Sequence, residues 1–411
     1  MSSFSPPESP SIPRDPRAIA LLMTASLAVM AAAAISPALP GLAIRFADHP
    51  DAAILTRMLV PAPALSIVLF ASLAGWISDR FGRRGPMLIG LALFSLAGSA
   101  GLYLADLNMI LASRFVLGVA MALIMTAETA LVGDYFAGPR RSTFTGWQIA
   151  ATNFGGFLFI ALASWLAGFA PNLAFAVYLL PALYIPFVWF AIEPGGKVHR
   201  AAVTFAGEVP RERWLWQGLL VLIALMTLLS VMGFFVMPTQ LPFFAAELGF
   251  DVPSTTGLAL GALTLVGGAA ALTNGWLSRR IGTSGVLALG FGLMAGGFWL
   301  LTLSAALVIV LAGAAAIGAG FSTLRPAFIL LTLNVAPAQR RGFASGVLTT
   351  GMFLGQFLSP LVFSPLIAGL GYAAIFAATA VVLLAAMVMA GLVQAVTLLL
   401  GTPLRTRPRA E

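Results

Sequence analysis

Three ionisable residues, Arg114, Glu128 and Arg325, lie inside long apolar segments, where charge is costly. A charged side chain at the centre of a bilayer costs about 2.5–3.5 kcal/mol, so such residues usually serve a function. A carboxyl group holds its proton in an apolar environment and releases it near a cation. Glu128 is therefore predicted to carry a proton, and Arg325 is predicted to govern its release.

Other roles remain open for these three residues. The planar guanidinium of Arg325 also suits a carboxylate or phosphate group on a substrate. Glu128 could instead form a structural ion pair or face a water-filled vestibule. Arg114 lies 14 residues before Glu128, which is about 21 Å along a helix axis, so these two cannot pair directly.

Composition places the chain in a bilayer. Hydrophobic residues make up 60% and charged residues only 9% of the 411 residues, which leaves too little charge to cover a soluble protein. Apolar runs of about 20 residues follow one another, each long enough to cross a hydrocarbon core of about 30 Å. The sequence therefore predicts an all-α integral membrane protein.

Several other classes of protein are disfavoured. Cysteine is absent and the two histidines, His49 and His199, lie in predicted loops, so no metal site is expected. The sequence contains no phosphate-binding Walker motif and no recognisable catalytic triad. The net charge of +8 comes largely from arginines in predicted loops. We expect no enzyme activity, no cofactor and no nucleic-acid partner.

Twelve membrane spans are predicted, in two groups of six. They run near 18–40, 53–77, 86–105, 109–133, 143–168, 172–192, 215–241, 254–277, 284–303, 306–333, 343–369 and 372–400. The predicted domains are a disordered cytoplasmic tail (1–17), an N-terminal six-helix bundle (18–192), a cytoplasmic linker (193–214), a C-terminal six-helix bundle (215–400) and a basic cytoplasmic tail (401–411).

A repeat relates the two predicted bundles. Segment 75–82 (GWISDRFG) recurs 200 residues later as segment 275–282 (GWLSRRIG). At the same offset, Arg140 and Arg141 match Arg340 and Arg341. The constant offset predicts two pseudo-symmetric halves.

The arginines predict the orientation of the chain. They concentrate in both tails and in the loops after spans two, four, six, eight and ten, whereas the opposite loops are mainly acidic. Because basic loops stay in the cytoplasm, we expect a multi-pass protein of the cell inner membrane with both termini cytoplasmic. Arg57, near the outer end of the second span, is expected to reach water.

One loop carries a family signature, Gly-x-x-x-Asp-Arg-x-Gly-Arg-Arg. It is matched in full by Gly75, Asp79, Arg80, Gly82, Arg83 and Arg84. With twelve spans and the second copy, the chain resembles the major facilitator superfamily from about residue 18 to residue 400. The resemblance implies two six-helix bundles, alternating access, a substrate site near the bilayer midplane between the bundles, and a monomer.

Two departures from the family pattern bear on subclass. Arg114 and Gly118 match a fourth-span motif only in part, because the glutamine is missing. Span five carries Gly155 and Gly156 but lacks the glycine-proline motif of the family's proton-driven drug exporters.

The signature loop is predicted to act as a cytoplasmic gate. Gly75 allows close helix contact, and Gly82 permits a tight turn. Asp79 can meet the amino-terminal end of span eleven, near Arg341, where free backbone N–H groups favour an anion. Asp134 is expected to join this charge cluster. The second copy has Arg279 in place of Asp79, so its latch is expected to be weaker or absent.

The remaining polar residues in the spans complete the predicted site. The candidates for a substrate cavity are Arg114, Gln148, Asn153, Gln240 and Gln356; each of the four amides can equally bond helices together. The sequence thus predicts a proton-coupled secondary transporter of a small organic solute, with efflux of amphipathic or drug-like compounds as the leading hypothesis. The alternative is uptake of an organic anion or aromatic micronutrient, by proton symport or uniport, with Arg325 as the anchor.

Overall fold

The computed structural model describes residues 12–194, 213–303, 306–337 and 340–399, and within these ranges the regular structure is helical. The predicted tail 401–411 lies outside the described residues. So do most of the predicted tail 1–17 and most of the predicted linker 193–214.

The first half of the chain forms six membrane-crossing segments. The first segment is built from α1 (Pro16–Ala25), α2 (Leu27–Ala33), the 3-10 turn η2 (Ser36–Ala38) and α3 (Leu39–Arg45). The next are α4 (Ala52–Met58) with α5 (Ala62–Phe81), α6 (Arg84–Gly98) with η3 (Ser99–Leu102), α7 (Leu107–Tyr135), α8 (Gly138–Ala167), and η4 (Pro171–Leu183) with α9 (Tyr184–Ala191).

The second half contains four long helical runs, two of which turn back on themselves. They are α10 (Arg213–Glu247), α11 (Val252–Leu303), α12 (Leu307–Val335) and α13 (Arg341–Leu399). A straight helix of 52 residues, the length of α11, would extend about 78 Å, far beyond the bilayer core. The backbone leaves helical geometry at Gly282 in α11 and at Gly371 in α13.

These two breaks give the predicted number of spans. The described residues hold ten helical stretches that are long and apolar enough to cross a membrane. Two of them, α11 and α13, each contain two spans, so the total is twelve. The predicted fold class, an all-α membrane protein, is confirmed.

The sequence repeat is also a repeat of backbone conformation. Gly82 follows α5 with φ 81° and ψ 168°, and Gly282 breaks α11 with φ 72° and ψ 172°. Helices α7 and α12 are both 29 residues long and begin at Leu107 and Leu307. Only glycine adopts this positive-φ region easily, so the signature glycine fixes the turn in both copies.

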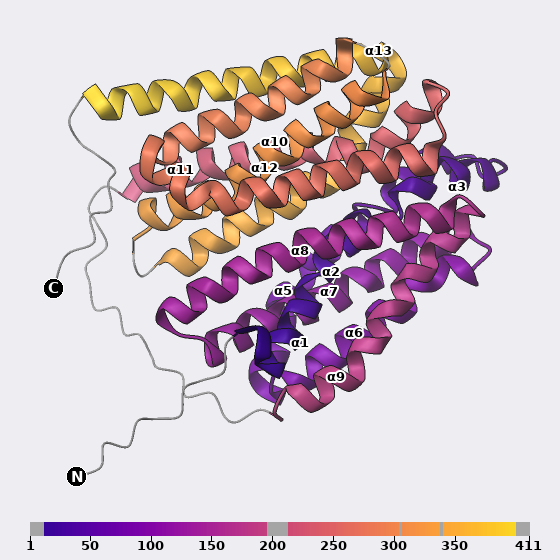
Figure 1. Cartoon of the computed structure of the whole chain (residues 1–411), viewed down its shortest axis with the longest axis horizontal. Coiled ribbons are helices and arrows are strands. Elements are labelled where there is room, and N and C mark those ends of the chain that lie inside the picture. Colours follow the sequence, from indigo (N-terminus) through magenta and orange to yellow (C-terminus); the bar gives the residue numbers. More distant parts are fainter. Residues whose placement is uncertain (1–11, 195–212, 304–305, 338–339, 400–411) are drawn as a thin grey trace.

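The helices of the two halves lie side by side (Figure 1), and the side chains form two main hydrophobic cores. The larger core draws almost entirely on the first half of the chain, and the other almost entirely on the second half. Helix α8 packs along α11 between them, where Gly261 faces Phe157 and Gly268 faces Asn153. The bundle bounds 18–192 and 215–400 stay predictions.

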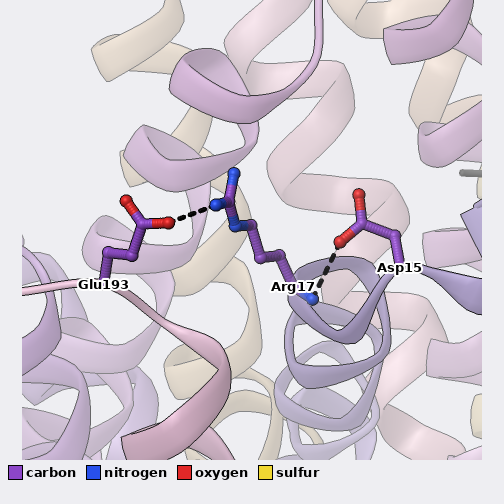
Figure 2. A network of polar contacts seen from close by, with 3 residues as sticks. All are labelled: Asp15, Arg17 and Glu193. Atoms are coloured by element: carbon purple, nitrogen blue, oxygen red, sulfur yellow. Dashed lines mark hydrogen bonds and ion pairs between the residues drawn. The ribbon is translucent and has the colours of Figure 1, made fainter. Parts of the chain in front are cut away.

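The ordered chain begins before residue 18. Ile12–Arg14 form a 3-10 turn, and the Asp15 carboxylate caps α1 by accepting from the backbone N–H of Arg17 at 3.0 Å. Figure 2 shows that the guanidinium of Arg17 forms an ion pair with Glu193, at the start of the predicted linker. Asp15 also pairs with Arg140 at 3.1 Å. Because of these bonds, residues 12–17 differ from the predicted disordered tail.

We predict that Gly371→Ala destabilises the protein by about 1–3 kcal/mol, because the φ of 79° at Gly371 lies in a region that is nearly forbidden to alanine. The matched control is Gly369→Ala, since an added Cβ has open space at both positions and Gly369 lies within the regular helix. Thermal unfolding in detergent should show a lower midpoint for the first variant and an unchanged or higher midpoint for the second. Equal midpoints would refute the strain argument.

Candidate functional site

Glu128 lies buried in the first half of the chain, on α7, with 4% of its surface exposed. The side-chain amide of Gln148, on α8, donates a hydrogen bond of 2.6 Å to its carboxylate. One turn further along α8, Thr152 donates to the carbonyl of Ala25 on α1. Glu128 thus lies beside the place where α8 meets α1, and its hydrogen-bond partner is a neutral amide.

Arg325 lies on α12 beside a small cavity of about 10 Å³, which is room for about one water molecule. The cavity is lined from α10, α12 and α13 by Thr227, Ser230, Val231, Phe321, Leu324, Arg325, Phe328 and Met352. The arginine side chain is exposed. Arg325 thus has solvent-accessible surface although it lies deep among the surrounding helices.

No ion pair joins Glu128 and Arg325 in the part of the chain that the structure describes. In the register that aligns α7 with α12, Arg325 matches Met125. Met125 lies three residues before Glu128, or about 4.5 Å of helix rise. The two groups therefore lie at similar depths in equivalent helices, and their approach in another conformation stays a prediction.

Arg114 is fully buried among helices of the first half. Its guanidinium donates to the carbonyls of Ala97 and Gly98 at the end of α6 and lies over the rings of Phe175 and Tyr178 in η4. The carbonyls at a helix carboxyl end attract a cation, so this contact joins α7 to α6 and η4. A role for Arg114 in the substrate cavity stays a prediction.

The other cavity candidates lie at contacts between helices. Asn153 bonds to the Ile149 carbonyl and packs against Gly268 of α11. Gln240 is fully buried on α10 and donates to the hydroxyl of Ser364 at 2.8 Å. Gln356 is buried on α13.

Arg57 on α4 is a residue whose role sequence reasoning missed. Its Nε donates to the amide oxygen of Gln240 at 3.2 Å, and its guanidinium lies 4.0 Å from the ring centre of Phe243. Both partners belong to α10, in the second half of the chain. The available signal was a basic residue on the mainly acidic side. Its expected exposure to water gave no reason to look for partners on another helix.

The residues predicted as a gate lie at the end of the bundle opposite Arg57. We call this end the arginine-rich side; it contains the turns at Gly82 and Gly282. Arg83 forms an ion pair with Asp134 and donates to the carbonyl of Ala130 at 2.7 Å. The guanidinium of Arg84 lies 4.0 Å from the ring centre of Trp189. The structure thus brings the signature loop against the ends of α7 and α9.

The rest of the predicted gate is on the surface. Asp79 and Arg80 are exposed at the end of α5, and the guanidinium of Arg80 lies near the ring of Trp76. An added Cβ at Gly75 would meet nothing within 4 Å. At the start of α13, Arg341 is exposed. The latch between Asp79 and α13 stays a prediction.

The contacts between the two halves concentrate away from the arginine-rich side. There Arg57 reaches Gln240, and Ser164 near the end of α8 donates to the carbonyl of Pro253 at the start of α11. On the arginine-rich side the large side chains at the helix ends are exposed, including Trp76, Trp147, Trp276 and Phe343. The protein is therefore held together at the ends opposite its arginine-rich loops.

The sequence matches the Major Facilitator Superfamily over residues 21–267 and 223–409. The chain belongs to this superfamily. Members of this superfamily are multi-pass membrane transporters of small molecules and are not enzymes. The likeness that the signature loop suggested is therefore confirmed.

Superfamily members with different substrates resemble this chain. Multidrug resistance protein 2 of Bacillus subtilis is 32% identical over 134 residues, which are 32% of this chain and 34% of that protein. The niacin transporter NiaP of Acinetobacter baylyi is 29% identical over 128 residues, 29% of this chain and 28% of that protein. The chain thus aligns with only about a third of these two relatives. The quinolone resistance protein NorA of Staphylococcus aureus is 23% identical over 74% of this chain and 79% of its own length.

Solved structures of the superfamily share the fold. The D-xylose-proton symporter superposes with a TM-score of 0.73 at 18% identity, covering 91% of this chain and 96% of its own. The POT family transporter PepTSo gives a TM-score of 0.69 at 13% identity, covering 95% of this chain and 99% of its own.

We predict that Arg57→Ala loosens the contact between the two halves at the ends opposite the arginine-rich side, because it removes the hydrogen bond to Gln240 and the contact with Phe243. The chain has no cysteine, so spin labels can be placed at Asp51→Cys and Ala246→Cys, both exposed. Electron spin resonance should report longer label distances in the variant. The control is Arg45→Ala, an exposed arginine at the end of α3. Identical label distances in the wild type and in both variants would show that Arg57 does not stabilise this contact.

Proposed function

We propose that this superfamily member is a proton-coupled secondary transporter of a small organic solute, working by alternating access, with Glu128 as the proton-carrying group. The observation that carries the proposal is the surroundings of Glu128: a carboxyl group buried at 4% exposure and bonded to a neutral amide. An ionised carboxylate in an apolar interior needs a cation. A protonated carboxyl group needs only the hydrogen bond that Gln148 supplies.

Arg325 is the proposed partner in the opposite state. Glu128 and Arg325 lie at similar depth on the pseudo-equivalent helices α7 and α12. Closing the arginine-rich side would move these helices toward each other. A cation that approaches Glu128 favours loss of its proton, and separation favours its return. Proton loading would then follow the same motion that exposes the solute to each side in turn.

The two sides of the protein have separate proposed gates. Arg57 and Gln240 hold one side closed in this structure. On the arginine-rich side, Asp79 would bind the free N–H groups at the start of α13 when that side closes. The Arg83–Asp134 ion pair anchors the loop that presents Asp79. The excess of arginine in these loops supports a cytoplasmic location for this side and for both termini.

Two substrate classes have specific support. Similarity to multidrug resistance protein 2 and to NorA supports efflux of amphipathic or drug-like compounds. Similarity to NiaP, together with the exposed cation Arg325, supports uptake of an organic anion. Proton coupling through Glu128 serves either direction.

We predict that Glu128→Gln abolishes uphill transport driven by a pH gradient and leaves solute exchange intact, because glutamine keeps the hydrogen bond to Gln148 and cannot carry a proton. Proteoliposomes loaded separately with ethidium and with radiolabelled nicotinate test both substrate classes. Glu247→Gln, the same change at an exposed position, is the control and should accumulate solute like wild type.

Accumulation of either probe against its gradient by Glu128→Gln would overturn the proposed role of Glu128. If the variant loses both accumulation and exchange, a thermal unfolding curve shows whether it is still folded. A folded variant that cannot exchange would show that Glu128 acts in solute movement rather than in coupling.

A further inference from the structure

A wide apolar groove, which we call the α11–α13 groove, lies on the second half of the chain. It has a volume of about 490 Å³ and runs between the part of α11 after Gly282 and the part of α13 after Gly371. It is lined by four residues of α11, from Ala288 to Leu293, and by Met387, Val388 and Gly391 of α13. Figure 1 shows this part of α13, in yellow, at the edge of the molecule. The groove therefore faces the lipid of the membrane.

A glycine on each wall keeps the groove open. A Cβ added at Gly292 would come within 2.7 Å of the Met387 sulfur, so Met387 lies directly over this glycine. A Cβ added at Gly391 would meet nothing within 4 Å. The larger lining side chains Leu289 and Val388 are 40% and 49% exposed. Walls that face an empty space lose their dispersion contacts, so an apolar partner stabilises this groove.

The groove lies at the depth of the acyl chains of one leaflet. Ala288 and Leu293 follow the Gly282 turn by six and eleven residues, which is about 9 to 17 Å of helix rise. Half of the hydrocarbon core is about 15 Å thick. An acyl chain that enters from the arginine-rich side thus reaches the whole groove within its own leaflet.

The end of the groove nearest the Gly282 turn is basic. Arg279 and Arg280 are exposed just before this turn, and the guanidinium of Arg280 lies 4.6 Å from the ring centre of Trp276. Exposed tryptophan is typical of the head-group level of a bilayer, so this pair marks that level. Beyond α13 the sequence adds Arg405, Arg407 and Arg409.

The charge at this end selects the head group. The segments 275–293 and 387–410 contain no acidic residue. Basic residues at the membrane surface attract anionic lipids. The segment that follows α13 does not suit the groove itself, because three arginines and a glutamate stand among the twelve residues 400–411 and charge is costly in hydrocarbon.

The first half has a side-chain bridge where the second half has none of the same kind. The guanidinium of Arg84 lies over the ring of Trp189 at 4.0 Å, which joins the start of α6 to α9. At the 200-residue offset, Ser284 and Met389 stand in place of these two residues. Serine is too short to reach across to a neighbouring helix as arginine does. The repeat thus leaves this end of the second half accessible to a lipid.

We propose that the α11–α13 groove is a binding site for an anionic phospholipid, with an acyl chain against Gly292 and Gly391 and the head group near Arg279 and Arg280. The groove is lined by residues other than Glu128 and Arg325. The inference therefore does not depend on the proposed transport function.

Native mass spectrometry of the purified full chain tests the head group. It counts the lipid molecules that stay bound when dioleoyl phosphatidylglycerol, which is anionic, or dioleoyl phosphatidylcholine, which has the same chains and no net charge, is added. Wild type should retain phosphatidylglycerol about 10-fold better, because each basic residue near the surface favours an anionic lipid. Equal retention of the two lipids would overturn the proposal.

Variants that fill the groove test its place. Gly391→Leu and Ala288→Leu extend a side chain into the groove from opposite walls and should each lose the bound phosphatidylglycerol. The control Gly369→Leu makes the first change at an exposed position of α13 where a Cβ also has open space, and it should retain the lipid. Thermal unfolding in detergent shows which variants are folded. Wild-type retention by a folded Gly391→Leu or Ala288→Leu variant would overturn the proposal.

A charge variant tests the position of the head group. Replacing Arg279 and Arg280 together by glutamine should remove most of the preference for phosphatidylglycerol and leave retention of phosphatidylcholine unchanged. Arg45→Gln, at an exposed arginine on α3, should keep the preference. An unchanged preference in the double variant would contradict the proposed head-group site. A dimer mass in wild type that disappears in Gly391→Leu would assign the groove to a second copy of the chain instead.

Discussion

The cost of an ionised group in an apolar interior is the constraint on which this transporter depends. A membrane-embedded carboxylate or guanidinium must be neutralised, solvated or paired, and the structure meets this demand differently at each site. Arg114 binds helix-end carbonyls and aromatic faces. Glu128 has one neutral amide donor, and Arg325 is exposed. Arg114 thus has partners within the protein, whereas in our proposal Glu128 is neutralised by a proton.

The repeat places two of these ionisable groups at equivalent positions in the two halves. Because α7 and α12 share length and register, Glu128 and Arg325 lie at similar depths in opposite halves of the molecule. The contacts between the halves lie at the ends away from the arginine-rich loops, around Arg57 and along α8 and α11. In the proposed cycle Arg325 approaches Glu128 when the proton has left, and the two groups separate when the proton returns.

The fold followed from the sequence because its determinants are local. Apolar runs predicted the twelve spans. Gly82 and Gly282 marked two turns with positive φ, a conformation that glycine adopts without strain. The site depended on tertiary contacts that no spacing encodes. Gln148 was named as a cavity residue, but its bond to Glu128 could not be read from a separation of 20 residues. Arg57 was expected to reach water, and its partner Gln240 lies 183 residues away. Residues 12–17 looked like part of a tail because their ion-pair partners, Arg140 and Glu193, lie far along the chain.

The central claim is that Glu128 exchanges a proton in step with substrate binding, and counting protons tests it most directly. Purified protein in weakly buffered detergent solution, with a pH-sensitive dye, reports the protons released or taken up when substrate is added. Binding and protonation are linked reciprocally, so the account predicts a substrate-dependent proton change in wild type and none in Glu128→Gln, which should still bind the substrate. An equal proton change in both proteins would contradict the account.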